Sequence, residues 1–84
     1  MSKKIMMTVR DVKAEAFTQP WFVRAEGEGV REFTKLCNDP DHPVGQQPED
    51  YILYKTGEWD ELTGKTTAEE EPVSVISGTS VAVA

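Results

Sequence analysis

Most of the aliphatic side chains in this sequence are branched at the β-carbon, and this bias constrains the fold more than any other feature. The chain contains nine Val and three Ile but only three Leu. Such side chains lose rotamers in a helix and pack well on a pleated sheet. Since 84 residues make one domain at most, we expect a small domain rich in strands. A helical bundle, a multidomain enzyme and a large buried cofactor pocket are excluded.

The hydrophobic pattern predicts one short helix in the first half of the chain. Apolar and polar residues alternate over 4–10, as they do in a half-buried strand. Residues 28–37 instead carry an apolar stripe at helical spacing, made of Val30, Phe33, Leu36 and Cys37. The run Asn38-Asp39-Pro40 then ends the helix, because proline cannot continue it.

The second half of the chain predicts a hairpin. Its first strand covers 51–54, with a continuation to Trp59 left open. The turn contains Gly64, which supplies the positive φ that a tight turn needs. The segments predicted to follow are a return strand at 65–68, a break at 69–72 and a last short strand at 73–76.

The connecting segments are less regular. Residues 13–17 fit one helical turn, which Pro20 ends. The apolar group Trp21-Phe22-Val23 follows, with Phe22 expected in the core. Three prolines fall within 39–48, so we expect a loop with its own packing or function.

The order of these elements predicts an α+β fold: a small two-layer domain, with one helix packed on an antiparallel sheet of three to four strands (β-α-β-β). The domain covers 1–76, and 77–84 is expected to be a weakly structured C-terminal tail. Because the core is small for a free-standing monomer, we expect a homo-oligomer. The predicted core residues are Ile5, Met7, Val9, Phe22, Val30, Phe33, Leu36, Tyr51, Leu53 and Trp59.

Charge is unevenly distributed along the chain, which has a net charge of −6. Residues 1–37 contain seven Lys or Arg and five Asp or Glu, a net charge of +2; residues 38–84 contain two and ten, a net charge of −8. An acidic chain is unsuited to strong non-specific DNA binding. The mildly basic first half can still meet an acidic surface, and the polarity suits association between copies.

The sequence also predicts a compartment. A single cysteine cannot form an internal disulfide and fits a reducing environment. No apolar run reaches the 18 residues of a membrane span, and the basic N-terminus lacks the apolar core of a signal peptide. We therefore expect a cytosolic protein with no membrane partner.

Residues that could do chemistry are few and isolated. His42 lies between Asp39 and Asp41, and such a group could bind a metal or transfer protons. The chain has no second His, however, and Asn38 and Asp39 are better explained as capping groups in a proline-stiffened loop. Cys37 fits a buried position of the helical stripe. We therefore predict no enzyme, no catalytic residue, no metal and no cofactor; an enzyme centred on His42 is the open alternative.

The Trp21-Phe22 pair indicates a different kind of site. With three cations nearby in the sequence, Trp21 could stack on the bases of a single-stranded nucleic acid. In the alternative, Trp21 covers the core or meets a second subunit. Trp59 lies between two acidic residues that would repel phosphates, so it is expected to be the poorer platform.

Six segments together carry a family resemblance: Val12-Lys13-Ala14-Glu15-Ala16-Phe17, Gln19-Pro20-Trp21-Phe22, Asn38-Asp39-Pro40-Asp41-His42-Pro43, Pro48-Glu49-Asp50-Tyr51, Gly57-Glu58-Trp59-Asp60 and Thr63-Gly64-Lys65. In this order they resemble the small nonstructural protein of gokushovirus-type microviruses, which are tail-less bacteriophages with circular single-stranded DNA. The resemblance covers roughly residues 4–75. Its most specific part is the third segment followed by the fourth.

The resemblance implies a role in viral DNA replication, by analogy with the small early protein of related phages that switches synthesis from duplex to single-stranded circles. It assigns no catalytic residue. We therefore expect a non-enzymatic protein of the host cytoplasm that binds single-stranded DNA or the replication-initiation complex. The residues expected to contact nucleic acid are Lys3, Lys4, Arg10, Lys13, Trp21, Arg24 and Lys35.

The alternative is a protein-interaction adaptor without DNA contact. In that case the acidic second half docks on a basic surface of the phage initiator, another phage protein or a host replication protein. The residues expected to contact that partner are Asp39, Asp41, Glu49, Asp50, Glu58, Asp60 and Glu61.

Overall fold

One long strand, β1 (Lys3–Asp11), organises the sheet. The computed structural model describes residues 2–82. The other strands are β2 (Ala16–Phe17), β3 (Trp21–Val23), β4 (Tyr51–Asp60) and β5 (Thr66–Ser77). The helices are α1 (Glu26–Cys37), α2 (Pro43–Gln46), the 3₁₀ turn η1 (Pro48–Asp50) and α3 (Gly78–Val81). A mixed α+β fold with an antiparallel sheet is confirmed, although the sheet contains more strands than expected.

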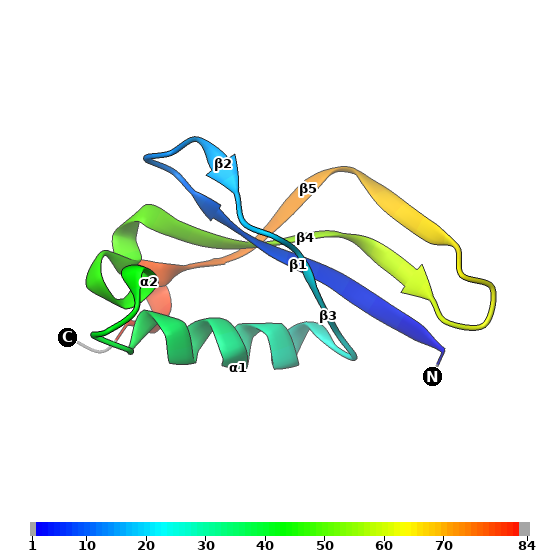
Figure 1. The fold of residues 1–84 in the computed structure, drawn as a ribbon, viewed down its shortest axis with the longest axis horizontal. Coiled ribbons are helices and arrows are strands. Elements are labelled where there is room, and N and C mark those ends of the chain that lie inside the picture. Colours follow the sequence, from blue (N-terminus) through cyan, green and yellow to red (C-terminus); the bar gives the residue numbers. More distant parts are fainter. Residues whose placement is uncertain (1, 83–84) are drawn as a thin grey trace.

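The sheet has the order β2-β1-β4-β5, and β3 also pairs with β1. Because β1 is nine residues long, both short strands can pair with it along the same hydrogen-bonding edge. β3 pairs with Ile5, Met6 and Met7, and β2 pairs with Arg10 and Asp11. The longest helix, α1, lies along one side of the sheet, and the other helices lie on that side too (Figure 1). The sheet therefore has one covered side and one uncovered side.

The core lies between α1 and the covered side of the sheet. Successive strand residues point to opposite sides, so the alternation predicted for β1 holds and Met7 and Val9 are buried. The stripe of α1 supplies Phe33 and Cys37. The buried apolar residues are Met7, Val9, Val23, Phe33, Cys37, Val44 and Leu53; partly buried ones around them include Ile5, Val30, Leu36 and Tyr51.

Two predicted core residues lie elsewhere. Phe22 is 47% exposed, because β3 is a strand whose pairing with β1 turns Trp21 and Val23 toward the core and Phe22 away from it. Trp59 is only half-buried and contacts Phe22 on the uncovered side. Val23 and Val44 take their places in the core. The expectation that Phe22 fills the core was therefore wrong.

β5 pairs with β4 near both of its ends but not in its middle part. Lys55 pairs with Val73 and Gly57 pairs with Ala68, so residues 69–72 face only Thr56. In Figure 1 this part of β5 arches away from β4. The break predicted at 69–72 is therefore real in the pairing, although the backbone stays extended and forms one strand rather than two. The predicted turn is confirmed at Gly64, whose φ is +74°.

The connecting segments are more ordered than their sequences indicate. The helical turn predicted at 13–17 is wrong: the Asp11 carboxylate accepts hydrogen bonds from the backbone N–H groups of Lys13 and Ala14, and the chain turns back into β2. The proline-rich loop contains α2 and η1. Within the expected tail, α3 packs against α1 and η1, and Asn38 donates a hydrogen bond to the carbonyl of Val81. Residues 83 and 84 of that tail lie outside the described residues.

Candidate nucleic-acid interface

The uncovered side of the sheet carries a continuous group of aromatic and basic side chains, which we call the open face. Its members are the strand residues that alternate with Ile5, Met7 and Val9, together with their partners in register. They are Lys4, Met6, Thr8, Arg10, Phe17, Phe22, Ile52, Tyr54 and Trp59. No helix covers this side in Figure 1. These residues are partly or largely exposed, except Thr8, which is 3% exposed and donates a hydrogen bond to the carbonyl of Thr18.

Four aromatic residues of the open face form two pairs. Phe17 and Tyr54 meet edge to face, with ring centroids 5.3 Å apart. Phe22 and Trp59 lie 5.8 Å apart at a tilt of 55°. Phe17 is 42% exposed and Phe22 is 47% exposed, so each pair presents one ring to solvent. Exposed rings on a sheet are the usual platform on which unpaired bases stack.

Cations lie near both ends of the open face. The Arg10 guanidinium lies 5.2 Å from the centre of the Phe17 ring. Lys4 pairs in register with Trp59, beside the second aromatic pair. With a strand rise of about 3.3 Å per residue, Lys4 and Arg10 are roughly 20 Å apart. The face therefore presents two cations with rings between them.

The acidic residues at paired strand positions all point to the covered side. Asp11 alternates with Arg10, and Glu58 and Asp60 flank Trp59, so strand alternation turns their side chains away from the open face. The two carboxylates beside Trp59 were expected to make it a poor stacking platform. The reason for that expectation does not hold, because residues adjacent in a strand lie on opposite sides of the sheet.

The predicted nucleic-acid residues are only partly brought together. Lys4 and Arg10 lie on the open face. Lys3 points to the covered side, and Lys35 lies on α1, which also belongs to that side. Lys13 is exposed in the turn between β1 and β2, and its backbone N–H bonds the Asp11 carboxylate. Arg24 follows β3 and lines a hollow with Lys3, Lys4 and Glu61.

Trp21 does not lie on the open face. It pairs with Met7, packs against the core, and donates a hydrogen bond of 2.6 Å from its indole N–H to the Glu32 carboxylate on α1. The alternative in which Trp21 covers the core is therefore confirmed. The platform residues that sequence reasoning missed are Phe17, Tyr54 and Trp59. Alternation within β4 was the signal available for Trp59, whereas no local pattern reports the contact between Phe17 and Tyr54.

The acidic residues predicted to dock a protein partner form two separate groups. Asp39, Asp41, Glu49 and Asp50 lie around α2 and η1, before β4 begins. Glu58, Asp60 and Glu61 lie where β4 ends. The ten residues of β4 separate the two groups by roughly 30 Å. They do not form one acidic surface.

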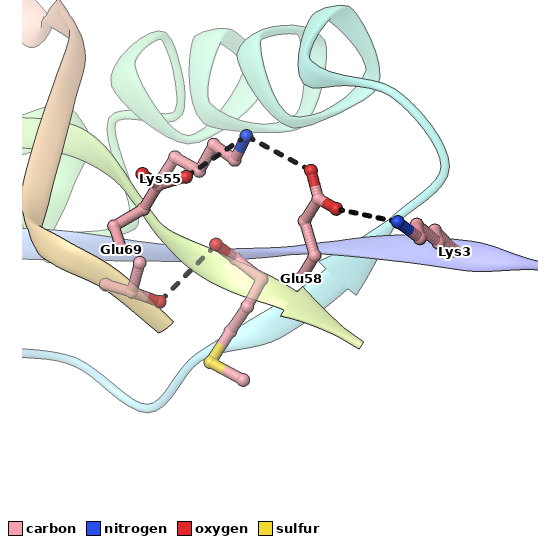
Figure 2. A network of polar contacts seen from close by, with 6 residues as sticks. Lys3, Lys55, Glu58 and Glu69 are labelled. Atoms are coloured by element: carbon pink, nitrogen blue, oxygen red, sulfur yellow. Dashed lines mark hydrogen bonds and ion pairs between the residues drawn. The ribbon is translucent and has the colours of Figure 1, made fainter. Parts of the chain in front are cut away.

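A charged network on the covered side holds β4 to its neighbours (Figure 2). The Lys55 ammonium lies 3.3 Å from a Glu69 carboxylate oxygen and 3.5 Å from one of Glu58, and Glu58 reaches Lys3 at 4.0 Å. Partial burial lowers the pKa of Lys55, but the hydrogen bonds and charges of Glu69 and Glu58 outweigh it and raise that pKa above its ordinary value. The network ties the arching part of β5 to β4.

The groups considered for chemistry have structural partners. The His42 ring accepts a hydrogen bond at Nδ1 from the backbone N–H of Val44, and so caps α2. Cys37 is 3% exposed, and burial raises the pKa of its thiol. In residues 2–82, no group of three or more His, Cys, Asp or Glu side chains could hold a metal ion. None of the helices described is long and apolar enough to cross a bilayer.

Comparison with known proteins found one family. The family model described as "Phage ORF5 protein" matches residues 4–81, nearly the whole chain. The searches of curated proteins and of solved structures gave no match.

Proposed function

Because the chain belongs to the phage ORF5 protein family, we propose that this bacteriophage protein acts in viral DNA replication by binding single-stranded DNA on the open face of its sheet. In this proposal it is not an enzyme, and it works in the host cytoplasm. Family membership supports a phage protein. The replication role rests on the resemblance to gokushovirus nonstructural proteins.

The observation that carries the proposal is that aromatic and basic side chains lie on one side of the sheet and acidic side chains on the other. Two aromatic pairs and two cations share the open face, while the acidic residues at paired strand positions occupy the other side. Stacking contributes about 1–3 kcal/mol per base and tolerates any base sequence. A strand of DNA would therefore find stacking and positive charge without a carboxylate at a paired position of the sheet.

The same geometry favours single strands over duplexes. Rings on an open sheet stack only on bases that are unpaired. Two cations neutralise too few phosphates to hold a duplex by charge alone. We further propose that the protein binds as a homo-oligomer, since several linked faces raise the effective concentration for one strand.

The two tryptophans give a direct test by fluorescence. Oligothymidylate titrated into the protein at low salt should quench Trp59, which lies on the open face, and spare Trp21, which lies on the covered side. Quenching should therefore survive Trp21→Phe and disappear in Trp59→Phe. Anisotropy of a labelled oligonucleotide follows binding independently, and Phe22→Ala should weaken it about 5- to 150-fold.

Two results would contradict the proposal. One is the absence of salt-sensitive binding at low-micromolar protein in either readout. The other is quenching that persists in Trp59→Phe and is lost in Trp21→Phe, which would place the nucleic acid on the covered side of the sheet.

A further inference from the structure

A hollow of about 390 Å³ lies at the end of the sheet where β1 begins, lined by Lys3, Lys4, Arg24 and Glu61. Three parts of the chain meet there because β3 and β4 pair with the same stretch of β1: Ile5 faces both Val23 and Glu58. The backbone N–H of Glu61 donates to the carbonyl of Ser2 at 2.9 Å and holds the end of β4 in place. The hollow therefore lies where β3 and β4 both pair with the start of β1.

The hollow has an excess of positive charge. Three cations line it against one carboxylate. Lys3 is partly engaged, since its ammonium lies 4.0 Å from Glu58 in the network of Figure 2. The ion pairs found among residues 2–82 include neither Lys4 nor Arg24. Lys4 and Arg24 are therefore available to bind an anion.

The hollow also adjoins one of the aromatic pairs. Lys4 lies opposite Trp59 in the sheet, and Phe22, the partner of Trp59, lies opposite Met6, two residues along β1 from Lys4. A phosphate in the hollow would thus lie beside rings that can take a base. At the other aromatic pair, the Arg10 guanidinium already lies over the Phe17 ring.

We propose that the hollow is a phosphate-binding subsite, in which Lys4 and Arg24 hold a backbone phosphate of the nucleotide whose base stacks on Phe22 and Trp59. The inference rests on the proposed function and adds a position for one phosphate. It places the DNA strand across the open face from this end toward Arg10. In this arrangement Glu61 weakens binding, because its carboxylate repels the bound phosphate.

The test is the salt dependence of oligothymidylate binding, measured by anisotropy. Each phosphate contact that is lost reduces the slope of log K against log salt by about 0.7 for a single strand. Lys4→Gln and Arg24→Gln should each reduce the slope by this amount, whereas Phe22→Ala should weaken binding with an unchanged slope. Arg31→Gln on α1 is the matched control, since it removes the same charge from the other side of the sheet. Glu61→Gln should tighten binding.

The outcomes separate this inference from the function it rests on. If Lys4→Gln and Arg24→Gln keep the wild-type slope while Phe22→Ala weakens binding, the subsite is refuted and the open face stands. A change in Arg31→Gln equal to that in Arg24→Gln would also refute it, because the effect would then be one of net charge. If the wild-type protein binds no oligonucleotide, both proposals fail.

Discussion

Gly78 lies so close to Pro48 that a Cβ atom added to it would overlap the Pro48 carbonyl oxygen. This contact joins the start of α3 to η1, two segments that lie thirty residues apart in the sequence. Only a glycine allows the approach. The C-terminal helical turn is therefore held by backbone packing as well as by Val81, which packs against the core.

Gly78→Ala should consequently destabilise the domain, by about 1–3 kcal/mol, as overpacking does elsewhere. Gly27→Ala is the matched control. Gly27 lies in α1 with nothing within 4 Å of an added Cβ, so alanine there should stabilise by up to about 1 kcal/mol. Urea denaturation followed by circular dichroism measures both. Equal effects in the two variants would show that the contact with Pro48 is unimportant.

Two leucines should differ sharply in their contribution to stability. Leu53 in β4 is 0% exposed, whereas Leu62 is 82% exposed in the hairpin turn. Leu53→Ala should cost about 2–5 kcal/mol, since it removes buried methyl groups and leaves a cavity. Leu62→Ala should stay within about 0.5 kcal/mol of wild type. A loss at Leu62 as large as that at Leu53 would place the hairpin turn in a buried contact.

The ion pair between Lys55 and Glu69 should contribute to stability, although modestly. The two side chains are 22% and 34% exposed and lie 3.3 Å apart. Glu69→Gln should therefore lower the free energy of unfolding by about 0.5–1 kcal/mol and bring the pKa of Lys55 down. Glu70→Gln, in the exposed part of the same arch, is the control and should have no such effect. An unchanged Lys55 pKa in Glu69→Gln, measured by NMR titration, would contradict the assignment.

Cys37 should make the stability fall at alkaline pH. Burial raises the pKa of its thiol above the ordinary value of 9.0. Well below pH 9.0 the thiol is protonated in both the folded and the unfolded state, and its contribution to stability is complete. As the pH rises further the unfolded thiol ionises first, so the unfolded state gains and stability is lost until the folded pKa is passed.

The reactivity of the same thiol tests its burial, which is the cause of the raised pKa. A thiol reagent at pH 8 should modify the native protein far more slowly than the urea-unfolded chain, because the native side chain is 3% exposed. Equal rates would mean that Cys37 is accessible in the folded state.

Local patterns were enough to predict β1 and α1. The alternation over 4–10 and the apolar stripe ending at Cys37 each have a period that only one secondary structure fits, and both predictions were confirmed. β3 could not be found this way. Three residues are too few to show a period. The side of the sheet to which their side chains point depends on pairing with Met7, which is remote in the sequence. For this reason Phe22 was expected in the core and Trp21 was named among the nucleic-acid contacts.

The candidate site was half predictable for a related reason. Lys4 and Arg10 lie in the one strand whose alternation is clear. Phe17 and Tyr54 meet only because two strands flank β1, and no local signal reports such a contact. Trp59 could have been recognised, since alternation within β4 already separates it from Glu58.

The arch in β5 also decides how copies of this protein can meet. β5 is the outermost strand of the sheet, and an uninterrupted outermost strand is a template for pairing with another chain. Residues 69–72 break that template with three glutamates and a proline, leaving only short stretches on either side. The charges and the proline disfavour fibril-like growth along this edge, so we expect copies of the protein that meet at β5 to do so through side chains rather than through a shared backbone ladder.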